Sequence, residues 1–68
     1  MVTKHEEHRR HAGFTITELA RRAKVSRPYA SKIEAGKIPA SKRYREAFSA
    51  LCHVPEEWVF DSAGRVLQ

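Results

Sequence analysis

The chain has 68 residues, enough for one small domain, and a formal net charge of +5. Its single cysteine, Cys52, excludes an internal disulfide and fits a reducing setting. No apolar run approaches the ~20 residues that cross a bilayer, and the charged first residues lack the apolar stretch of a signal peptide. We therefore expect a cytoplasmic protein that neither enters a membrane nor depends on disulfides.

Positive charge is concentrated in the middle of the chain. Residues 21–45 contain nine of the 13 Lys and Arg but one of the 8 acids, Glu34, so this window carries +8 and the rest of the chain −3. Such an uneven distribution favours a polyanion as partner. The alternative is a solvated basic face that only keeps the protein soluble, and charge alone does not choose between the two.

The first half of the chain contains punctuation for two helices. The first helix is expected over residues 3–12, ended by Gly13. A second helix opens at Thr15, which with Glu18 has the spacing of a capping box, and stops near Lys24. Its apolar stripe consists of Ile16, Leu19, Ala20 and Ala23.

Three further helices are expected after this point. Ser26 caps the third helix, Pro28 falls in its first turn, and Gly36 ends it. The fourth follows the Ile38-Pro39 break and is capped by Ser41, with a stripe made of Tyr44, Ala47, Phe48 and Leu51. A short fifth helix runs from Pro55 through Phe60, and residues 61–68 are expected to be a flexible tail.

These elements predict an all-α fold of five short helices around a small core. The residues expected in that core are Leu19, Ala20, Val25, Ala30, Ile33, Phe48, Leu51 and Trp58. Strand patterns are weak, because no run alternates apolar and polar residues with β-branched side chains.

Residues 15–36 have the layout of a helix-turn-helix. Ala20 is a small residue where two helices would cross, and residues 23–26 form a tight turn. On the next helix Ala30 and Ile33 would face inward, while the outer face would carry Arg27, Tyr29 and Lys32. Side chains of this length near a helix N-terminus suit the major groove of DNA.

Over residues 6–60 the chain resembles the Cro/CI-type helix-turn-helix family, the phage-repressor-like DNA-binding domains. The matching residues are Arg9, Gly13-Phe14-Thr15, Glu18-Leu19-Ala20, Val25-Ser26-Arg27, Ser31-Lys32-Ile33-Glu34, Gly36-Lys37, Ile38-Pro39, Leu51 and Val54-Pro55-Glu56-Glu57-Trp58. The resemblance implies a lambda-repressor-like fold that binds double-stranded DNA in its major groove.

The resemblance also implies roles for single residues. Base contacts would come from Arg27, Pro28, Tyr29 and Lys32. Phosphate contacts would come from Thr15, Thr17, Ser31, Lys37, Ser41, Lys42 and Arg43. Arg9 and Glu34 occupy positions that pair in many relatives, so we expect Glu34 to hold Arg9 and not to meet DNA. A freely solvated Glu34 is the alternative.

The chain departs from the family at three positions. Ile16 stands where a polar residue usually binds a phosphate, so that contact is either absent or passed to Thr15 or Thr17. His5 and His8 replace aliphatic residues of the first helix, which puts the packing of that helix in doubt.

Nothing in the sequence makes a case for an enzyme, a cofactor or a metal. His5, His8 and His11 are spaced by three, so they drift around a helix, and no pair of cysteines supports them as zinc ligands. Cys52 beside His53 has no orienting third group, so it is interpreted as a small apolar residue. No small-molecule ligand is expected.

Trp58, Val59 and Phe60 leave two interpretations open. We expect Trp58 to close the core and at least one neighbour to face outward as a dimer interface; alternatively, all three cover the core. One recognition helix reads few base pairs, which favours a homodimer on a palindromic site. The sequence thus predicts a bacterial, phage or plasmid transcriptional regulator, most simply a repressor; the alternative is a toxin-neutralising antitoxin or another protein-interaction module on the same fold.

Overall fold

The computed structural model describes residues 2–68, which form four α-helices and one 3-10 turn. In chain order these are α1 (Lys4–His11), α2 (Ile16–Arg22), α3 (Arg27–Glu34), α4 (Lys42–Cys52) and the 3-10 turn η1 (Glu56–Trp58). The all-α prediction is confirmed over the described residues, with the expected fifth helix reduced to one turn. None of the described helices is long and apolar enough to cross a membrane.

Each α-helix begins at a hydroxyl residue that accepts a hydrogen bond from the third backbone amide of the helix. These caps are Thr3, Thr15, Ser26 and Ser41. At α2 the capping box is complete, because the Glu18 carboxylate also accepts from the Thr15 backbone N–H at 3.2 Å. The hydroxyl spacing seen in the sequence therefore fixes where the helices start.

The first three helices end in the same way, with one residue in the left-handed conformation. After α1 and α3 this residue is glycine, Gly13 with φ 89° and Gly36 with φ 80°. After α2 it is Lys24 with φ 61°. At each end two backbone N–H groups bond back into the last turn, for example Val25 N to Ala20 O at 3.0 Å, which satisfies carbonyls that the helix leaves free.

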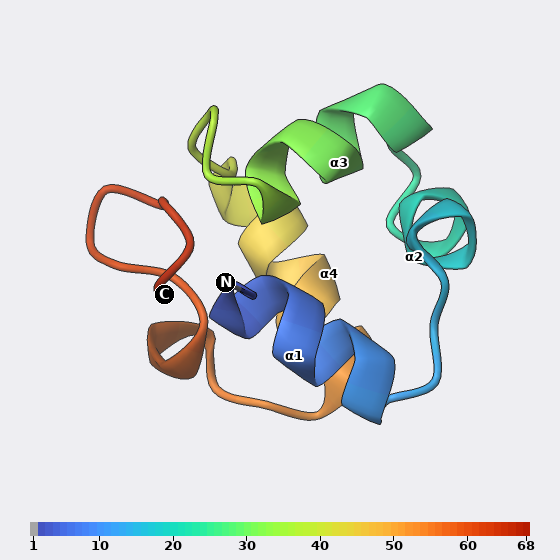
Figure 1. Cartoon of the computed structure of the whole chain (residues 1–68), viewed down its shortest axis with the longest axis horizontal. Coiled ribbons are helices and arrows are strands. Elements are labelled where there is room, and N and C mark those ends of the chain that lie inside the picture. The colour runs from blue at the N-terminus through green and yellow to red at the C-terminus, as the bar shows by residue number, and fades with distance from the viewer. Residues whose placement is uncertain (1) are drawn as a thin grey trace.

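The core lies between α4 and the other helices (Figure 1). Of the residues expected there, Leu19, Ala20, Ala30, Ile33 and Phe48 are buried, while Val25 and Leu51 are half-buried against them. Buried residues outside that list are His5, Ala23, Ala40, Tyr44, Val54, Val59, Phe60 and Val66. Ala23 and Tyr44 belong to the apolar stripes expected from the sequence, and Val59 and Phe60 to the alternative in which they cover the core.

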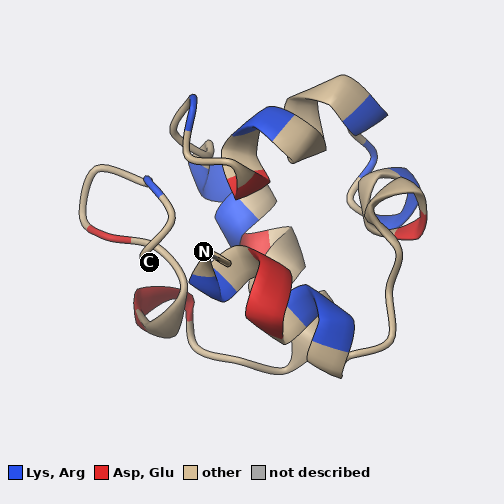
Figure 2. Cartoon of the chain, in the orientation of Figure 1, with Lys and Arg blue, Asp and Glu red and all other residues tan. Residues whose placement is uncertain are grey.

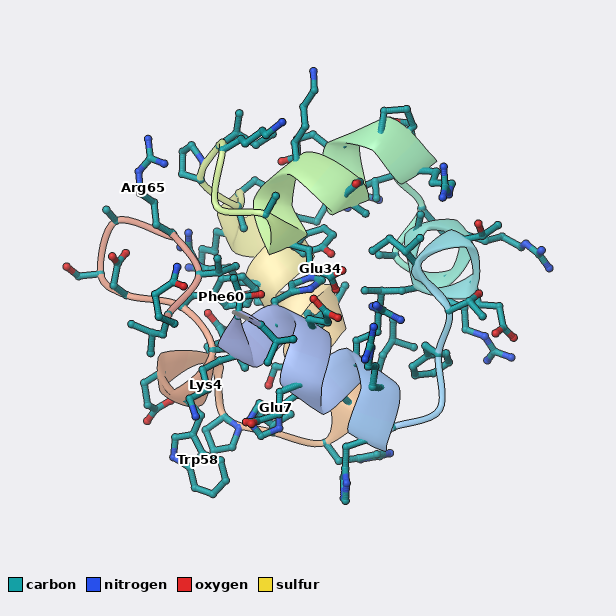
Figure 3. All side chains as sticks on the ribbon, viewed as in Figure 1. Lys4, Glu7, Glu34, Trp58, Phe60 and Arg65 are labelled. Carbon is teal, nitrogen blue, oxygen red and sulfur yellow. The ribbon has the colours of Figure 1, made fainter. Side chains whose placement is uncertain are left out.

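The placement of Trp58 was wrong in the sequence-based prediction. Trp58 is 59% exposed, whereas Val59 and Phe60 are 0% and 4% exposed. The reason is that helical structure stops at Trp58. Phe60 then forms an isolated antiparallel bridge with Val66, so helical periodicity no longer applies. Figure 3 shows Trp58 pointing outward below α1 and Phe60 lying inside. Val59 and Phe60 are thus core residues and not interface candidates.

Residues 61–68 are packed against the domain, contrary to the flexible tail expected from the sequence. Val66 is buried, and Leu67 both donates to Val59 O and accepts from Lys4 N, each at 2.8 Å. Gly64 O accepts from Ala40 N at 2.8 Å. These backbone bonds tie the end of the chain to α1 and to the loop before α4, which the sequence pattern alone does not reveal.

Candidate nucleic-acid interface

The centre of the candidate interface is α2, the turn 23–26 and α3. α2 and α3 pack against each other, and the small residue expected at their crossing, Ala20, is buried with 2% of its surface exposed. Lys24 bends the chain by its left-handed backbone, and Val25 packs as a half-buried plug against the core. The turn therefore sets the orientation of α3 relative to α2.

The second helix of this pair, α3, has a buried and an exposed face. Ala30 and Ile33 are both 0% exposed and hold the helix on the core. The exposed residues are Arg27, Pro28, Ser31 and Lys32. A helix that is anchored on one face and presents long donors on the other is suited to a DNA groove.

Tyr29 differs from the other residues expected to meet bases. It is half-buried, and its ring lies edge-to-face with that of Tyr44 at 6.0 Å. Part of the Tyr29 side chain therefore belongs to the packing between α3 and α4, which leaves less of it for a groove.

The residues expected at phosphates all lie on the surface: Thr15, Thr17, Ser31, Lys37, Ser41, Lys42 and Arg43 are exposed. Two of their hydroxyls already have a structural partner, since Thr15 Oγ1 and Ser41 Oγ cap α2 and α4. Ile16 is half-buried against the core and completes the apolar stripe of α2.

Exposed positive charge spans several elements. Figure 2 shows Lys and Arg on α2, on α3, in the loop after α3 and in the first turns of α4. All Lys and Arg of residues 21–45 are exposed except Arg45, which is half-buried. Arg45 donates to Ala40 O at 2.7 Å and lies 3.5 Å from a Glu56 carboxylate oxygen, so it serves the fold. The charge available to a polyanion is thus that of α2, α3, the loop and the start of α4.

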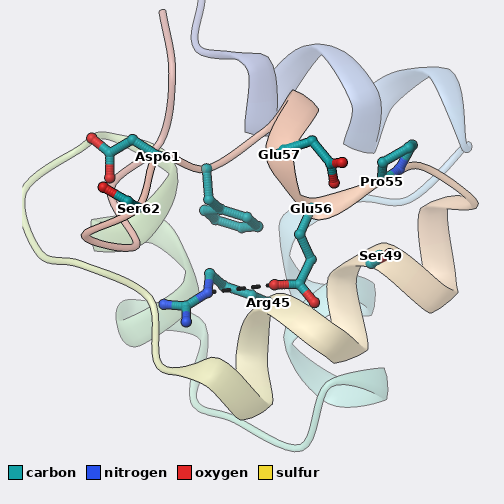
Figure 4. A pocket seen from close by; sticks show the side chains of 8 residues that line it. Arg45, Ser49, Pro55, Glu56, Glu57, Asp61 and Ser62 are labelled. Carbon is teal, nitrogen blue, oxygen red and sulfur yellow. Dashed lines mark ion pairs between the residues drawn. The ribbon is translucent and has the colours of Figure 1, made fainter.

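A hollow lined by three carboxylates lies beside α4. It has a volume of about 660 Å³ between α4 and the segment 55–62 (Figure 4). Its lining is Arg45, Ser49, Pro55, Glu56, Glu57, Phe60, Asp61 and Ser62. The three carboxylates would repel phosphates, so the hollow is not part of a nucleic-acid surface.

A buried polar network holds the C-terminal end of α3. The Arg9 guanidinium donates to both carboxylate oxygens of Glu34, Nε at 2.7 Å and Nη2 at 3.3 Å, and its Nη1 donates to Phe14 O at 2.7 Å. His5 Nδ1 lies 2.9 Å from the same carboxylate, and His5 Nε2 lies 2.7 Å from the Tyr44 hydroxyl. Glu34 is therefore engaged inside the protein and turned away from solvent, with 15% of its side chain exposed.

The environment of this network shifts two pKa values downward. Burial opposes the charge on Glu34, but hydrogen bonds from His5 and Arg9 outweigh burial and lower the pKa of the carboxyl to about 2. Burial lowers the pKa of the His5 imidazole below its usual 6.5, in spite of the opposing effect of Glu34. At neutral pH the network thus contains a carboxylate and a neutral imidazole.

His5 is the residue that sequence reasoning missed. The pattern suggested a weakly packed first helix, whereas His5 is 0% exposed and stacks on Phe48 with ring centroids 4.3 Å apart. A histidine can replace a core aliphatic residue when both ring nitrogens find partners, which here are Glu34 and Tyr44. Nothing in sequence spacing alone brings these three together.

Residues 2–68 contain no group of three or more His, Cys, Asp or Glu side chains able to hold a metal. Burial raises the pKa of the Cys52 thiol to about 11, so the thiol stays protonated at neutral pH and is a poor nucleophile.

Comparison with protein families agrees with this geometry. The model of a helix-turn-helix domain matches residues 6–59, from within α1 to just past η1. This range is consistent with the Cro/CI-type resemblance of residues 6–60. No curated protein and no solved structure gives a significant match. The match covers well over half of the chain, and the chain therefore belongs to the helix-turn-helix domain family.

Proposed function

We propose that this protein is a cytoplasmic, sequence-specific DNA-binding regulator that represses transcription by occupying an inverted-repeat operator as a homodimer. The observation that carries the proposal is the exposed outer face of α3, with Arg27 and Lys32, on a helix whose inner face is fully buried. Arg27 would bind a guanine through O6 and N7. Pro28, Tyr29 and Lys32 would make the other contacts to bases.

The exposed side chains around the loop and the start of α4 would supply most of the sequence-independent affinity. Lys37, Lys42 and Arg43 would neutralise phosphates, and Thr17 and Ser31 would add hydroxyl contacts. Such contacts fix the register of the protein on the duplex, while the α3 side chains select the sequence.

A homodimer follows from the small reach of one α3 helix. One copy would read only a few base pairs, and two copies on a palindrome would place half-sites about 34 Å apart. Of the three interface candidates, Trp58 is the one whose side chain is available, because it is 59% exposed. We propose it as part of the contact between two copies.

Selection of bound duplexes from a random pool tests this function. We expect enrichment of an inverted repeat with half-sites about one helical turn apart, bound in gel-shift assays with a steep dependence on salt because phosphate contacts release counterions. An enriched site without symmetry would exclude the homodimer, and a pool without enrichment would exclude sequence-specific binding.

A protein-interaction module, such as a toxin-neutralising antitoxin, is the second candidate function. The exposed Trp58 favours it, because an aromatic side chain left outside a small core suits a protein contact. The two functions differ in salt dependence and in the residues that matter. Loss of partner capture in Trp58→Ala, with unchanged capture in Arg27→Ala, would favour the interaction module over the regulator.

A further inference from the structure

His5 occupies a central place among the elements of the domain. Its ring stacks on Phe48 of α4 and lies edge-on to Phe60, with centroid distances of 4.3 and 6.1 Å. The side chain is fully buried, yet each ring nitrogen has a polar partner, Glu34 for Nδ1 and the Tyr44 hydroxyl for Nε2. His5 of α1 thus connects α3 and α4 by hydrogen bonds, in addition to packing in the core.

The two partners belong to the two elements that carry the candidate DNA contacts. Glu34 is the last residue of α3, and Tyr44 lies in the first turn of α4, next to Lys42 and Arg43. The Tyr44 ring also contacts the Tyr29 ring of α3. The hydrogen bonds of His5 therefore connect α3 to the start of α4 and help to fix the position of the outer face of α3 relative to α4.

We infer that His5 is a positioning residue for DNA recognition. By joining the end of α3 to the start of α4, it sets the alignment of the base-reading and phosphate-binding side chains. Protonation of His5 disturbs that alignment and weakens sequence-specific binding. This inference rests on the proposed function. The family match does not supply it, since His5 stands outside the matched residues 6–59.

The hydrogen-bond inventory explains why protonation must disturb the network. With a neutral imidazole, Nδ1–H donates to the Glu34 carboxylate and Nε2 accepts from the Tyr44 O–H. In the imidazolium Nε2 becomes a donor, so the Tyr44 oxygen must accept and its own proton loses this partner. The phenol cannot discharge that proton, because burial raises its pKa well above 10.0. A buried donor without a partner costs about 1–3 kcal/mol, which favours movement of the surrounding helices.

The charged and titratable groups around His5 come from each helix packed against it. From α1 these are Arg9 and Glu6, from α3 Glu34, and from α4 Tyr44; Phe48 and Phe60 contribute apolar rings. Burial is the largest influence on the pKa of His5 and lowers it, because burial disfavours the charged imidazolium. The Glu34 carboxylate raises this pKa, and the Arg9 charge lowers it further. Around the Tyr44 hydroxyl itself lie Glu34, Cys52, Tyr29 and Arg9.

Sequence-specific binding should be more sensitive than non-specific binding to such a movement. Bidentate contacts to a base edge require side chains held within about 0.5 Å of the productive position. Contacts to phosphates are largely electrostatic and tolerate displacement. The ratio of specific to non-specific affinity therefore reports the alignment of α3, whereas stability alone does not.

The test compares three full-length proteins at pH 7.5 and at mildly acidic pH: wild type, His5→Leu and His11→Leu. His5→Leu fills the same site with an apolar side chain, and His11→Leu is the matched control on the exposed end of α1. Two dissociation constants are measured by fluorescence anisotropy, one for the duplex selected from a random pool and one for an unrelated duplex, with circular dichroism to verify folding. NMR follows the imidazole and the backbone amides without DNA.

We expect His5→Leu to lower the specificity ratio about fivefold or more at pH 7.5 while remaining folded, with His11→Leu like wild type. On acidification the wild-type ratio should fall along the NMR titration of His5, together with shifts of α3 and α4 amides, and the ratio of His5→Leu should stay constant. An unchanged ratio in His5→Leu, or a wild-type ratio that does not follow the His5 titration, overturns the inference. If wild type binds no duplex at either pH, the proposed function fails. In that case the positioning role is tested separately by NMR, and it is overturned if the α3 amide signals do not shift when His5 is protonated.

Discussion

The Arg9 guanidinium and the Glu34 carboxylate form a two-pronged pair between α1 and the end of α3, with donor–acceptor distances of 2.7 and 3.3 Å. Both side chains are largely buried, at 11% and 15% exposure, so the pair has little competition from water. The same guanidinium holds Phe14 O, and the Thr3 hydroxyl donates to Glu34 O at 2.9 Å. The only acid in the basic window thus anchors the C-terminal end of α3 to α1.

Glu34→Ala should therefore destabilise the domain strongly. It leaves the buried Arg9 charge and the His5 Nδ1–H without an acceptor, and removing one partner of a buried pair costs about 3 kcal/mol or more. Replacing both residues, in Arg9→Met with Glu34→Leu, should cost less than Glu34→Ala alone, because no charge remains unpaired. Thermal and urea unfolding measure both; an unchanged midpoint in Glu34→Ala would contradict the anchoring role.

Stability should fall on acidification in two stages. The pKa values of His5 and Glu34 are both lower in the folded protein than their usual 6.5 and 4.5, so the unfolded chain binds more protons and the free energy of unfolding decreases as pH falls. The His5 contribution is complete above pH 6.5 and decreases below it; that of Glu34 is lost between pH 4.5 and about 2, with an upper limit on the order of 3 kcal/mol.

Urea unfolding from pH 8 to pH 3 checks this dependence. His5→Leu should abolish the first decrease, below pH 6.5, and keep a smaller second decrease, because Arg9 still lowers the pKa of Glu34 after the His5 hydrogen bond is lost. The same slope in His5→Leu and in wild type would assign the first stage to other groups.

Most of the fold could be predicted from the sequence, because capping residues close to each helix end determine the helix boundaries. Thr15, Ser26 and Ser41 cap helices as expected, and the apolar stripes of α2 and α4 face the core. Local rules failed where long-range contacts decide. The burial of Val59 and Phe60 depends on pairing with residues 66–67, and no periodicity predicts that.

The candidate interface shows the same division. The exposure of Arg27 and Lys32 follows from helical periodicity, since the opposite face carries Ala30 and Ile33. The half-burial of Tyr29 does not, because it depends on Tyr44 from another helix. His5 is the extreme case, with polar partners 29 and 39 residues away in sequence.

The turn of the helix-turn-helix stores strain that a substitution can remove. Lys24 has φ 61°, a conformation that costs a residue with a Cβ about 1 kcal/mol, and Gly36 holds the equivalent position after α3 with φ 80°. We expect Lys24→Gly to raise the free energy of unfolding by about 1 kcal/mol and Gly36→Ala to lower it by a similar amount. Urea unfolding at high salt, which screens the lost charge, measures both. Destabilisation by Lys24→Gly would show that its side chain contributes more than its backbone conformation costs.

Trp58 and Val59 should behave oppositely although they are neighbours. Trp58→Ser should leave the stability of the monomer nearly unchanged but weaken dimerisation, because the side chain is 59% exposed. Val59→Ala, at a fully buried position, should cost about 2 kcal/mol of stability through the cavity it leaves. Sedimentation equilibrium and thermal unfolding separate the two effects. A concentration-independent monomer in wild type, with or without operator DNA, would remove Trp58 from the interface.

Arg27 and Lys42 should separate sequence reading from phosphate binding. Arg27→Ala should weaken binding to the selected duplex by about 1–3 kcal/mol and relax the preference at one base position, with little effect on unrelated DNA. Lys42→Ala should weaken binding to all duplexes similarly and reduce the slope of log Kd against log salt by about 1. Both side chains are exposed, so neither change should alter the fold. Equal losses on all sequences in Arg27→Ala would reduce Arg27 to a phosphate contact, and an altered base preference in Lys42→Ala would place α4 among the sequence-reading elements.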